Sequence, residues 1–489
     1  MKQNMTVIIG LFGGRPDLLR RKGGHNFRLR RNLVIQAFFP LAMILLLIAG
    51  QDIRGQNLNG YLEEAAENNP ELIAKFKEYQ SALQRVPQAG SLADPQLSFG
   101  YYLRPMEFPM GKQHADLTLM QMFPWFGTLG SRKDEASRMA RVRYEAFRHA
   151  KNRLYFDVKT VWYELYELEK EKDIMETNLD LLEKLEDLAM TRFQSSSSNT
   201  SQSPAGGSSA MSSMGAGSMQ GGGSGNGNGM SDVLRARMEI NEMENMLAEL
   251  NDARILLKTR FNRLLNRPAQ MEVAVNDTLE IQPLTGTEQM LLDNIIEENP
   301  GIRMLDEEAA AYEIRQRTAV LEGRPSFGAG LNYMIFSAPS NGEVAMGGRN
   351  MVMPMVTMSL PIYRNKYKAR EREAELLRES TLYRQENLVN EFSVQLSESL
   401  KNISDAERRA ALNKRQAGLA DQTMDILITE YSVGRIRFEE LLRLQEQLLD
   451  YQLGLIRAVA DHNRLIARLE MLSASEIYGT TDENSIHIE

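Results

Sequence analysis

The sequence predicts a mainly α-helical chain with a transmembrane β portion, organised as tandem helix-strand-strand-helix repeats. Three observations support this fold class. Apolar residues recur every seven positions over long stretches, each half has a segment of alternating apolar and polar residues followed by a second apolar segment, and these patterns occur in the same order in both halves. Heptads are typical of coiled coils and alternation is typical of strands. A chain of 489 residues has room for one large repeated architecture of this kind.

Composition and charge exclude several classes of protein. Hydrophobic residues make up 43% of the chain, charged residues 25%, and there is no Cys. Disorder, a disulfide scaffold, thiolate catalysis and a cysteine-held metal are therefore excluded. The net charge is -8, although residues 1–50 carry eight Lys or Arg and one acid, so the remainder is acidic. An acidic chain of this kind is not expected to bind nucleic acid.

The N-terminus has the pattern of a secretory signal. Arg28, Arg30 and Arg31 precede an apolar run from Leu33 to Ile48, which ends in Ala49-Gly50. We predict a signal peptide over 1–50, with a retained membrane anchor as the alternative because the run approaches the length of a membrane span. No later apolar run has that length, so the exported chain is expected to be soluble or to cross a membrane as strands.

Each half opens with an Asn-Pro pair, Asn69-Pro70 and Asn299-Pro300, before a helical stretch. In each half an alternating segment follows, and then a second apolar segment that alternates less cleanly. Each is close to the ten residues with which a tilted strand crosses a bilayer. The four predicted strands are Gln96 to Arg104, Ala115 to Phe123, Ser326 to Phe336 and Met351 to Leu360.

Very long helices are predicted after Trp125 and after Tyr363, where the apolar period becomes seven. Neither half can bury such a seam alone, so the helices must pack on one another. We expect the first long helix to end near Arg192-Phe193 and the second near Gly434. The return helices are expected from Ser231 and Phe438. The two heptad series are Leu154, Val161, Leu168, Met175, Leu182, Ala189, and Leu441, Leu448, Leu455, His462, Leu469.

A low-complexity segment separates the first pair of long helices. Ser195 to Met230 contains 12 Ser and 10 Gly, a composition that cannot build a core, so we predict a mobile insert at the helical turn. The predicted organisation is a first repeat over 51–284, which holds the insert at 195–230, a second repeat over 285–473, and a C-terminal tail over 474–489.

These features together resemble the TolC-like outer-membrane efflux factor family. The most specific pieces are Asn69-Pro70-Glu71-Leu72, the segment from Leu92 to Gly100, and Tyr431-Ser432-Val433-Gly434 followed by Glu440-Leu441-Leu442. The resemblance implies a homotrimer in the outer membrane, with a β-barrel of four strands per chain surrounded by outer-membrane lipid and an α-helical tunnel in the periplasm. It also implies a periplasmic adaptor (membrane fusion) protein and an inner-membrane efflux pump as partners, the resistance-nodulation-division type being one candidate. The implied function is passive conduction of substrates out of the cell.

The resemblance also suggests a gate where the helix hairpins converge. Aligned on Val433-Gly434, Glu440 falls where the family often has an acidic gate residue, and Asp232 holds the equivalent place in the first half. Arg443 stands where some members have a second acid, which is a departure from that pattern. Tyr431 and Gly434 mark the helix turn at the tip. The alternative is that Asp232 stabilises a helix N-terminus and that Glu440 is a solvated surface charge.

The 28 methionines leave a second question open, because thioethers are soft ligands that suit Cu(I) or Ag(I). Metal handling, as in the heavy-metal efflux branch of the family, is one explanation for the abundant methionine, and flexible packing is the other. The five His are scattered without zinc spacing, and no nucleophile or phosphate-loop motif is present. We therefore expect no enzyme, no cofactor and no assigned metal site. An exported periplasmic coiled-coil scaffold without channel activity is the alternative to a channel.

Overall fold

The computed structural model describes residues 57–108, 111–198, 228–275, 278–284, 286–337 and 349–475. The chain divides into two units, Met1–Gly55 and Gln56–Glu489, and all described residues belong to the second. The predicted signal peptide, most of the Ser/Gly-rich insert and the tail from 476 onward lie outside the described residues.

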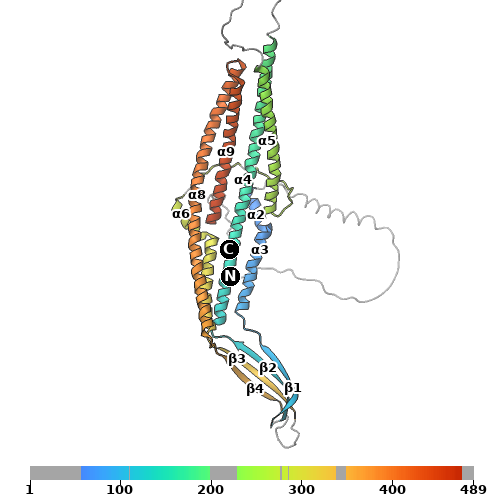
Figure 1. The fold of residues 1–489 in the computed structure, drawn as a ribbon, viewed down its shortest axis with the longest axis vertical. Helices are drawn as coiled ribbons and strands as arrows, with labels where there is room; N and C mark the ends of the chain where they lie inside the picture. Colours follow the sequence, from blue (N-terminus) through green and yellow to red (C-terminus); the bar gives the residue numbers. More distant parts are fainter. Residues whose placement is uncertain are drawn as a thin grey trace, which may run out of the picture. The chain divides into compact units, whose positions relative to one another are not determined.

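The first half of the unit runs through two short helices, two strands and two long helices (Figure 1). Asn69 separates the short helices and caps the second, its side-chain oxygen accepting from the backbone N–H groups of Glu71 and Leu72. Pro70 suits the first helical turn, where its missing N–H costs nothing. The elements are α2 (Leu58–Asn68), α3 (Pro70–Ala89), β1 (Gln96–Phe108), β2 (Gly111–Phe123), α4 (Thr128–Ser198) and α5 (Asn228–Leu264).

The second half repeats this order. Asn299 caps its second short helix by accepting from the backbone N–H of Gly301 at 2.7 Å. In both halves the capping amide also donates to the end of the last helix, from Asn69 to the Leu264 carbonyl at 2.9 Å and from Asn299 to the Leu472 carbonyl at 2.7 Å. The elements are α6 (Glu288–Glu298), α7 (Pro300–Glu322), β3 (Ser326–Ser337), β4 (Met351–Ser359), α8 (Arg364–Ser432) and α9 (Phe438–Ser473).

The four long helices form two antiparallel hairpins, α4 with α5 and α8 with α9, and α4 also packs against α9 (Figure 1). All six residues of the predicted α4 heptad series are buried, and in α9 only Leu455 of the second series is half-exposed. One core cluster draws Leu182, Ile240, Met424 and Leu441 from all four helices. The mainly helical prediction is confirmed. No helix within the described residues combines the length and apolar character of a membrane span.

The first hairpin extends further than predicted. The sequence placed its ends near Arg192-Phe193 and at Ser231, whereas α4 continues to Ser198 and α5 begins at Asn228. The two helix ends lie in close contact, since a Cβ on Gly229 would stand only 3.2 Å from the Cβ of Phe193. The second hairpin turns as expected, with α8 ending at Ser432 and α9 beginning at Phe438.

The strands form one antiparallel sheet in the order β1-β2-β3-β4. The first hairpin of strands is longer than predicted, because β1 continues beyond Arg104 and β2 begins before Ala115. A register shift between Tyr101 and Met106 interrupts the alternation there, and pairing resumes beyond it, where Glu107 and Lys112 form an ion pair at 2.9 Å.

The register gives the sheet two chemically distinct faces. One face is apolar and exposed across all four strands, and Leu97, Phe99, Leu331 and Val356 are 51–83% exposed there. The opposite face carries most of the polar strand residues, and Asn332 donates there to the Thr118 hydroxyl at 2.6 Å. We call these the apolar face and the polar face of the sheet.

Candidate functional site at the helix tips

The turn between α8 and α9 lies at the end of the hairpins opposite the sheet (Figure 1). Gly434 has φ +79°, a left-handed conformation that glycine adopts without steric cost. The N–H of Gly434 donates to the Tyr431 carbonyl at 3.0 Å, and the N–H of Arg435 donates to the Glu430 carbonyl at 3.0 Å. These bonds satisfy carbonyls at the end of α8 and fix Tyr431 in the last turn of that helix.

Tyr431 is the centre of a cluster that joins all four long helices. Its fully buried ring lies 5.4 Å from the ring of Phe438 in α9, and the Arg192 guanidinium of α4 stands 4.5 Å from its centroid. Its hydroxyl donates to the Asp232 carboxylate of α5 at 3.2 Å. Arg192 also donates to the Tyr431 carbonyl at 3.3 Å. The first hairpin thus holds the second one at its tip.

Burial sets the protonation of this pair. Desolvation raises the pKa of Asp232, while the hydrogen bond from Tyr431 and the charge of Arg192 oppose that rise. Desolvation, followed by the negative charge of Asp232, raises the pKa of Tyr431 to about 12. The phenol therefore keeps its proton at physiological pH and remains the donor of the bond.

A second contact between the hairpins lies on the surface beside this cluster. Arg235 of α5 forms an ion pair with Glu439 in the first turn of α9, and the pKa of Glu439 is lowered by that bond. Because both groups are largely exposed, the pair is screened by solvent and salt and contributes little stability. Its effect is to align α5 with α9 next to the buried Tyr431–Asp232 bond.

The structure brings together only part of the predicted site. Asp232 and Tyr431 are bonded, and a Cβ on Gly434 would stand 3.4 Å from an Arg192 side-chain nitrogen. Glu440 and Arg443 are both exposed on α9, and no ion pair joins them among the described residues. Their role in a gate stays a prediction.

Sequence reasoning missed Arg192 in the cluster and both members of the ion pair beside it, Arg235 and Glu439. A weak signal existed for Arg192, since a basic residue in the last turn before a predicted reversal is placed to meet carbonyls of a neighbouring helix end. No sequence signal identifies the partner of Arg235, because that contact depends on how the two hairpins align.

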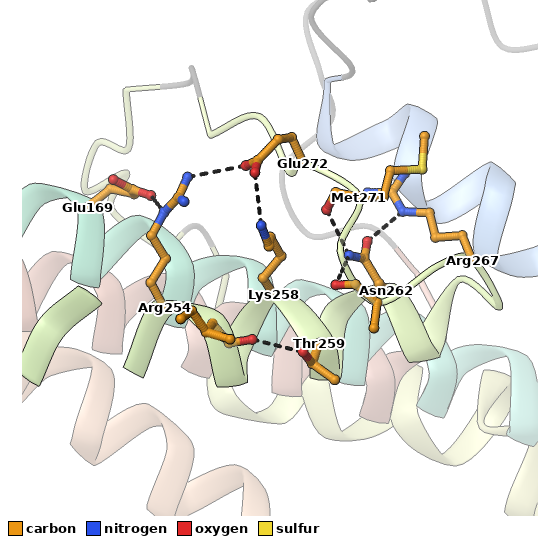
Figure 2. A network of polar contacts seen from close by, with 10 residues as sticks. Glu169, Arg254, Lys258, Thr259, Asn262, Arg267, Met271 and Glu272 are labelled. Atoms are coloured by element: carbon orange, nitrogen blue, oxygen red, sulfur yellow. Dashed lines mark hydrogen bonds and ion pairs between the residues drawn. The ribbon is translucent and has the colours of Figure 1, made fainter. Parts of the chain in front are cut away.

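A separate polar network fastens the segment after α5 to the helices (Figure 2). Glu272 accepts from Lys258 at 2.8 Å and from Arg254 at 3.5 Å, and Arg254 also donates to Glu169 of α4. Asn262 donates to the carbonyls of Ala269 and Met271 and accepts from the side chain of Arg267 (Figure 2). These bonds hold the backbone that follows α5 in place. Within the described residues, no three His, Asp or Glu gather as a metal site.

Comparison with known proteins identifies the fold. No family model and no curated protein matches the chain. Solved structures do match, among them the outer-membrane channel OprN with TM-score 0.65 and 14% identity over 86% of this chain and 90% of that one. The outer membrane protein VceC of Vibrio cholerae matches with TM-score 0.64 and 14% identity over 86% and 97%. The open state of the Neisseria gonorrhoeae MtrE outer membrane channel matches with TM-score 0.64 and 13% identity over 86% and 90%.

Each of these likenesses covers 86% of this chain. The chain has the fold of the TolC-like outer-membrane channels, as its sequence motifs predicted.

Proposed function

We propose that this protein is the outer-membrane channel of a tripartite efflux system, which conducts substrates passively from a periplasmic adaptor and an inner-membrane pump to the outside. The carrying observation is the sheet, whose apolar face is exposed on every strand while the opposite face holds most of the polar residues. That division suits strands with lipid on one side and a lumen on the other. The fold shared with outer-membrane channels supports the same function.

The proposal includes a homotrimer. β1 and β4 are the edges of the four-stranded sheet, and unpaired edges invite pairing with another chain. Four strands are too few to close a barrel, whereas three copies supply twelve. The helices also expose apolar side chains that neighbouring copies would cover, among them Leu234 and Ile255 on α5 and Val394, Leu419 and Ile426 on α8.

Within this function the helix-tip cluster acts as the periplasmic gate. The bond between Tyr431 and Asp232 ties one hairpin to the other, so conduction requires that it break and that the tips move apart. Asp232 and Glu440 from three copies would form acidic rings near the passage, and such rings attract cations and repel anions. Arg443, exposed one turn beyond Glu440, would moderate that negative charge.

Two neighbouring substitutions test membrane assembly. Phe99→Lys places a charge on the apolar face, and Ser98→Lys places the same charge on the polar face as a matched control. We expect the first to reduce the trimer in the outer-membrane fraction severely, because a lipid-facing Lys costs about 2–4 kcal/mol at mid-membrane, and the second to be tolerated. Light scattering of detergent-extracted wild type should show a trimer. A monomer that stays soluble without detergent would favour the periplasmic scaffold instead.

A further inference from the structure

The polar face of the sheet is unusually rich in methionine. The four described strands contain eight Met, and by the register six of them belong to this face. In β4 the residues that alternate with them on the apolar face are Val352, Pro354 and Val356. The six are Met120 and Met122 of β2, Met334 of β3, and Met351, Met353 and Met355 of β4.

Two of these thioethers converge over a glycine. A Cβ built on Gly328 would stand 2.6 Å from the sulfur of Met122, 3.3 Å from the sulfur of Met120 and 2.3 Å from the hydroxyl oxygen of Thr357. The same hydroxyl lies 3.8 Å from the Met120 sulfur and 3.9 Å from the Met122 sulfur. Because glycine has no side chain, the two sulfurs and the hydroxyl oxygen converge in the space above Gly328.

The neighbouring rows of the sheet extend this donor set. Gly330 pairs with Met120 on one side and with Met355 on the other, and a Cβ there would stand 3.1 Å from the Met120 sulfur. Met355 of β4 and Met120 of β2 therefore lie on the same face, and Gly330 of β3 lies between them. Met355 thus adds a third thioether to this face, on a side chain with three rotatable bonds.

Packing alone does not account for this arrangement. The exposed apolar surface of this sheet lies on the opposite face, which consists mainly of Leu, Phe, Tyr, Ile and Val. The methionines instead share their face with Thr118, Asn332 and Thr357, and Met120, Met122 and Met355 are only half-buried. A partly exposed cluster of neutral sulfur donors beside hydroxyl groups is chemically a site for a soft cation.

We propose that Met120 and Met122, with Thr357 over Gly328, form a binding site for a soft monovalent cation, Cu(I) or Ag(I), on the polar face of the sheet. The inference rests on the proposed function for its role, because that face would line the lumen and the site would meet ions in transit. Neutral thioethers bind without releasing a proton, so affinity should not change between pH 5.5 and 7.5, in contrast to a thiolate or imidazole site. Hard or borderline divalent cations should not compete.

Silver titration of the purified full-length protein in detergent tests the site. Isothermal titration with silver nitrate in chloride-free buffer should give a saturable site in wild type that weakens at least tenfold in the variant carrying Met120→Leu and Met122→Leu. Leucine keeps similar volume and removes only the sulfur. Met358→Leu is the matched control, since Met358 lies on the apolar face, and it should leave the site unchanged. Equal silver affinity in wild type and the double variant would overturn the proposal.

A measurement on wild type alone guards against a variant that fails to fold. Peroxide converts exposed methionine to its sulfoxide, and a bound ion should protect its ligands. Mass spectrometry should show slower oxidation of Met120 and Met122 with silver present, with Met358 unaffected, and equal rates with and without silver would contradict the site. Conductance in potassium nitrate distinguishes the proposed channel from the proposed silver site. If the protein conducts ions but binds no silver, only the silver site is overturned. If it binds silver but does not conduct, only the channel function is overturned.

Discussion

The hydroxyl of Tyr431 donates to the carboxylate of Asp232 at 3.2 Å, although α8 and α5 belong to different helical hairpins. The donor ring is fully buried, and the acceptor is half-buried beside Arg192. A bond in such surroundings is stronger than one in open water. Deleting a single oxygen atom, that of the Tyr431 hydroxyl, removes this hydrogen bond from the tip cluster.

Removing that oxygen should loosen the tip. Tyr431→Phe retains the ring contacts with Phe438 and Arg192 and leaves Asp232 without its donor. We expect higher basal conductance in planar bilayers and a loss of about 0.5–1.5 kcal/mol of stability. Tyr383→Phe is the control, because Tyr383 is 71% exposed on the same helix. Unchanged conductance in the Tyr431 variant would show that the gate lies elsewhere.

Selectivity should depend on the acids of the tip. Asp232→Asn together with Glu440→Gln removes the proposed rings, so cation preference and plugging by divalent cations from the periplasmic side should both weaken. Arg443→Ala should leave basal conductance near that of wild type, because no ion pair joins Arg443 to Glu440 among the described residues. Reversal potentials under a salt gradient measure the preference, with Asp421→Asn on exposed α8 surface as control. An increase in conductance on Arg443→Ala would instead reveal a pairing formed only in the closed trimer.

Asn299 should be a stability determinant. Its side chain caps α7 and also reaches the end of α9, so Asn299→Ala loses a helix cap and leaves the Leu472 carbonyl without that donor. We expect a loss of about 1–2 kcal/mol, seen as a lower midpoint of thermal unfolding by circular dichroism. Asn245→Ala is the control, because Asn245 only bonds the exposed Glu249 one turn away. Equal midpoints for the two variants would argue against the double role.

His462 should make stability fall in acid. It is 1% exposed, and neither ring nitrogen has a hydrogen-bond partner in the part of the chain that the structure describes. Burial lowers its pKa, although Glu407 lies 3.6 Å away and opposes the shift. Stability is complete above the ordinary His pKa of about 6.5 and falls below it, because the unfolded chain gains a proton first.

The slope from this residue is at most about 1.4 kcal/mol per pH unit, and it ends below the folded-state pKa. His462→Leu continues the apolar stripe of α9 and should flatten the pH dependence of the unfolding midpoint between pH 7 and 5. The same slope in wild type and variant would assign the acid sensitivity to other groups.

Periodicity predicted the elements well because burial enforces it. Each α4 heptad residue from Leu154 to Ala189 is buried, since any other face would expose the seam. The helix ends were predicted wrongly where tertiary packing, rather than the local sequence pattern, determines them. Helix α5 begins before Ser231 and packs closely on Phe193 of α4 through Gly229, and nothing local in the Ser-rich segment signals that contact.

The candidate site was predicted in part for the same reason. Gly434 and Tyr431 stand at a turn that local residues define, and Asp232 followed from comparing the two halves. Arg192 joins the cluster, and Glu439 joins the ion pair beside it, only through the alignment of separate hairpins, which no short stretch of sequence encodes. Likewise the two sulfurs above Gly328 become neighbours only through the strand register.

The paired asparagines Asn69 and Asn299 fasten each half of the chain separately, so the chain can be cut between the halves. Asn69 bonds the last turn of α5, and Asn299 bonds the end of α9, so each half closes upon itself through its own opening residue. The covalent link between Val275 and Thr287 is then not needed to fasten either half. Two polypeptides cut in that stretch and produced together should find each other through the packing of α4 on α7 and α9, and so reconstitute a protein from fragments.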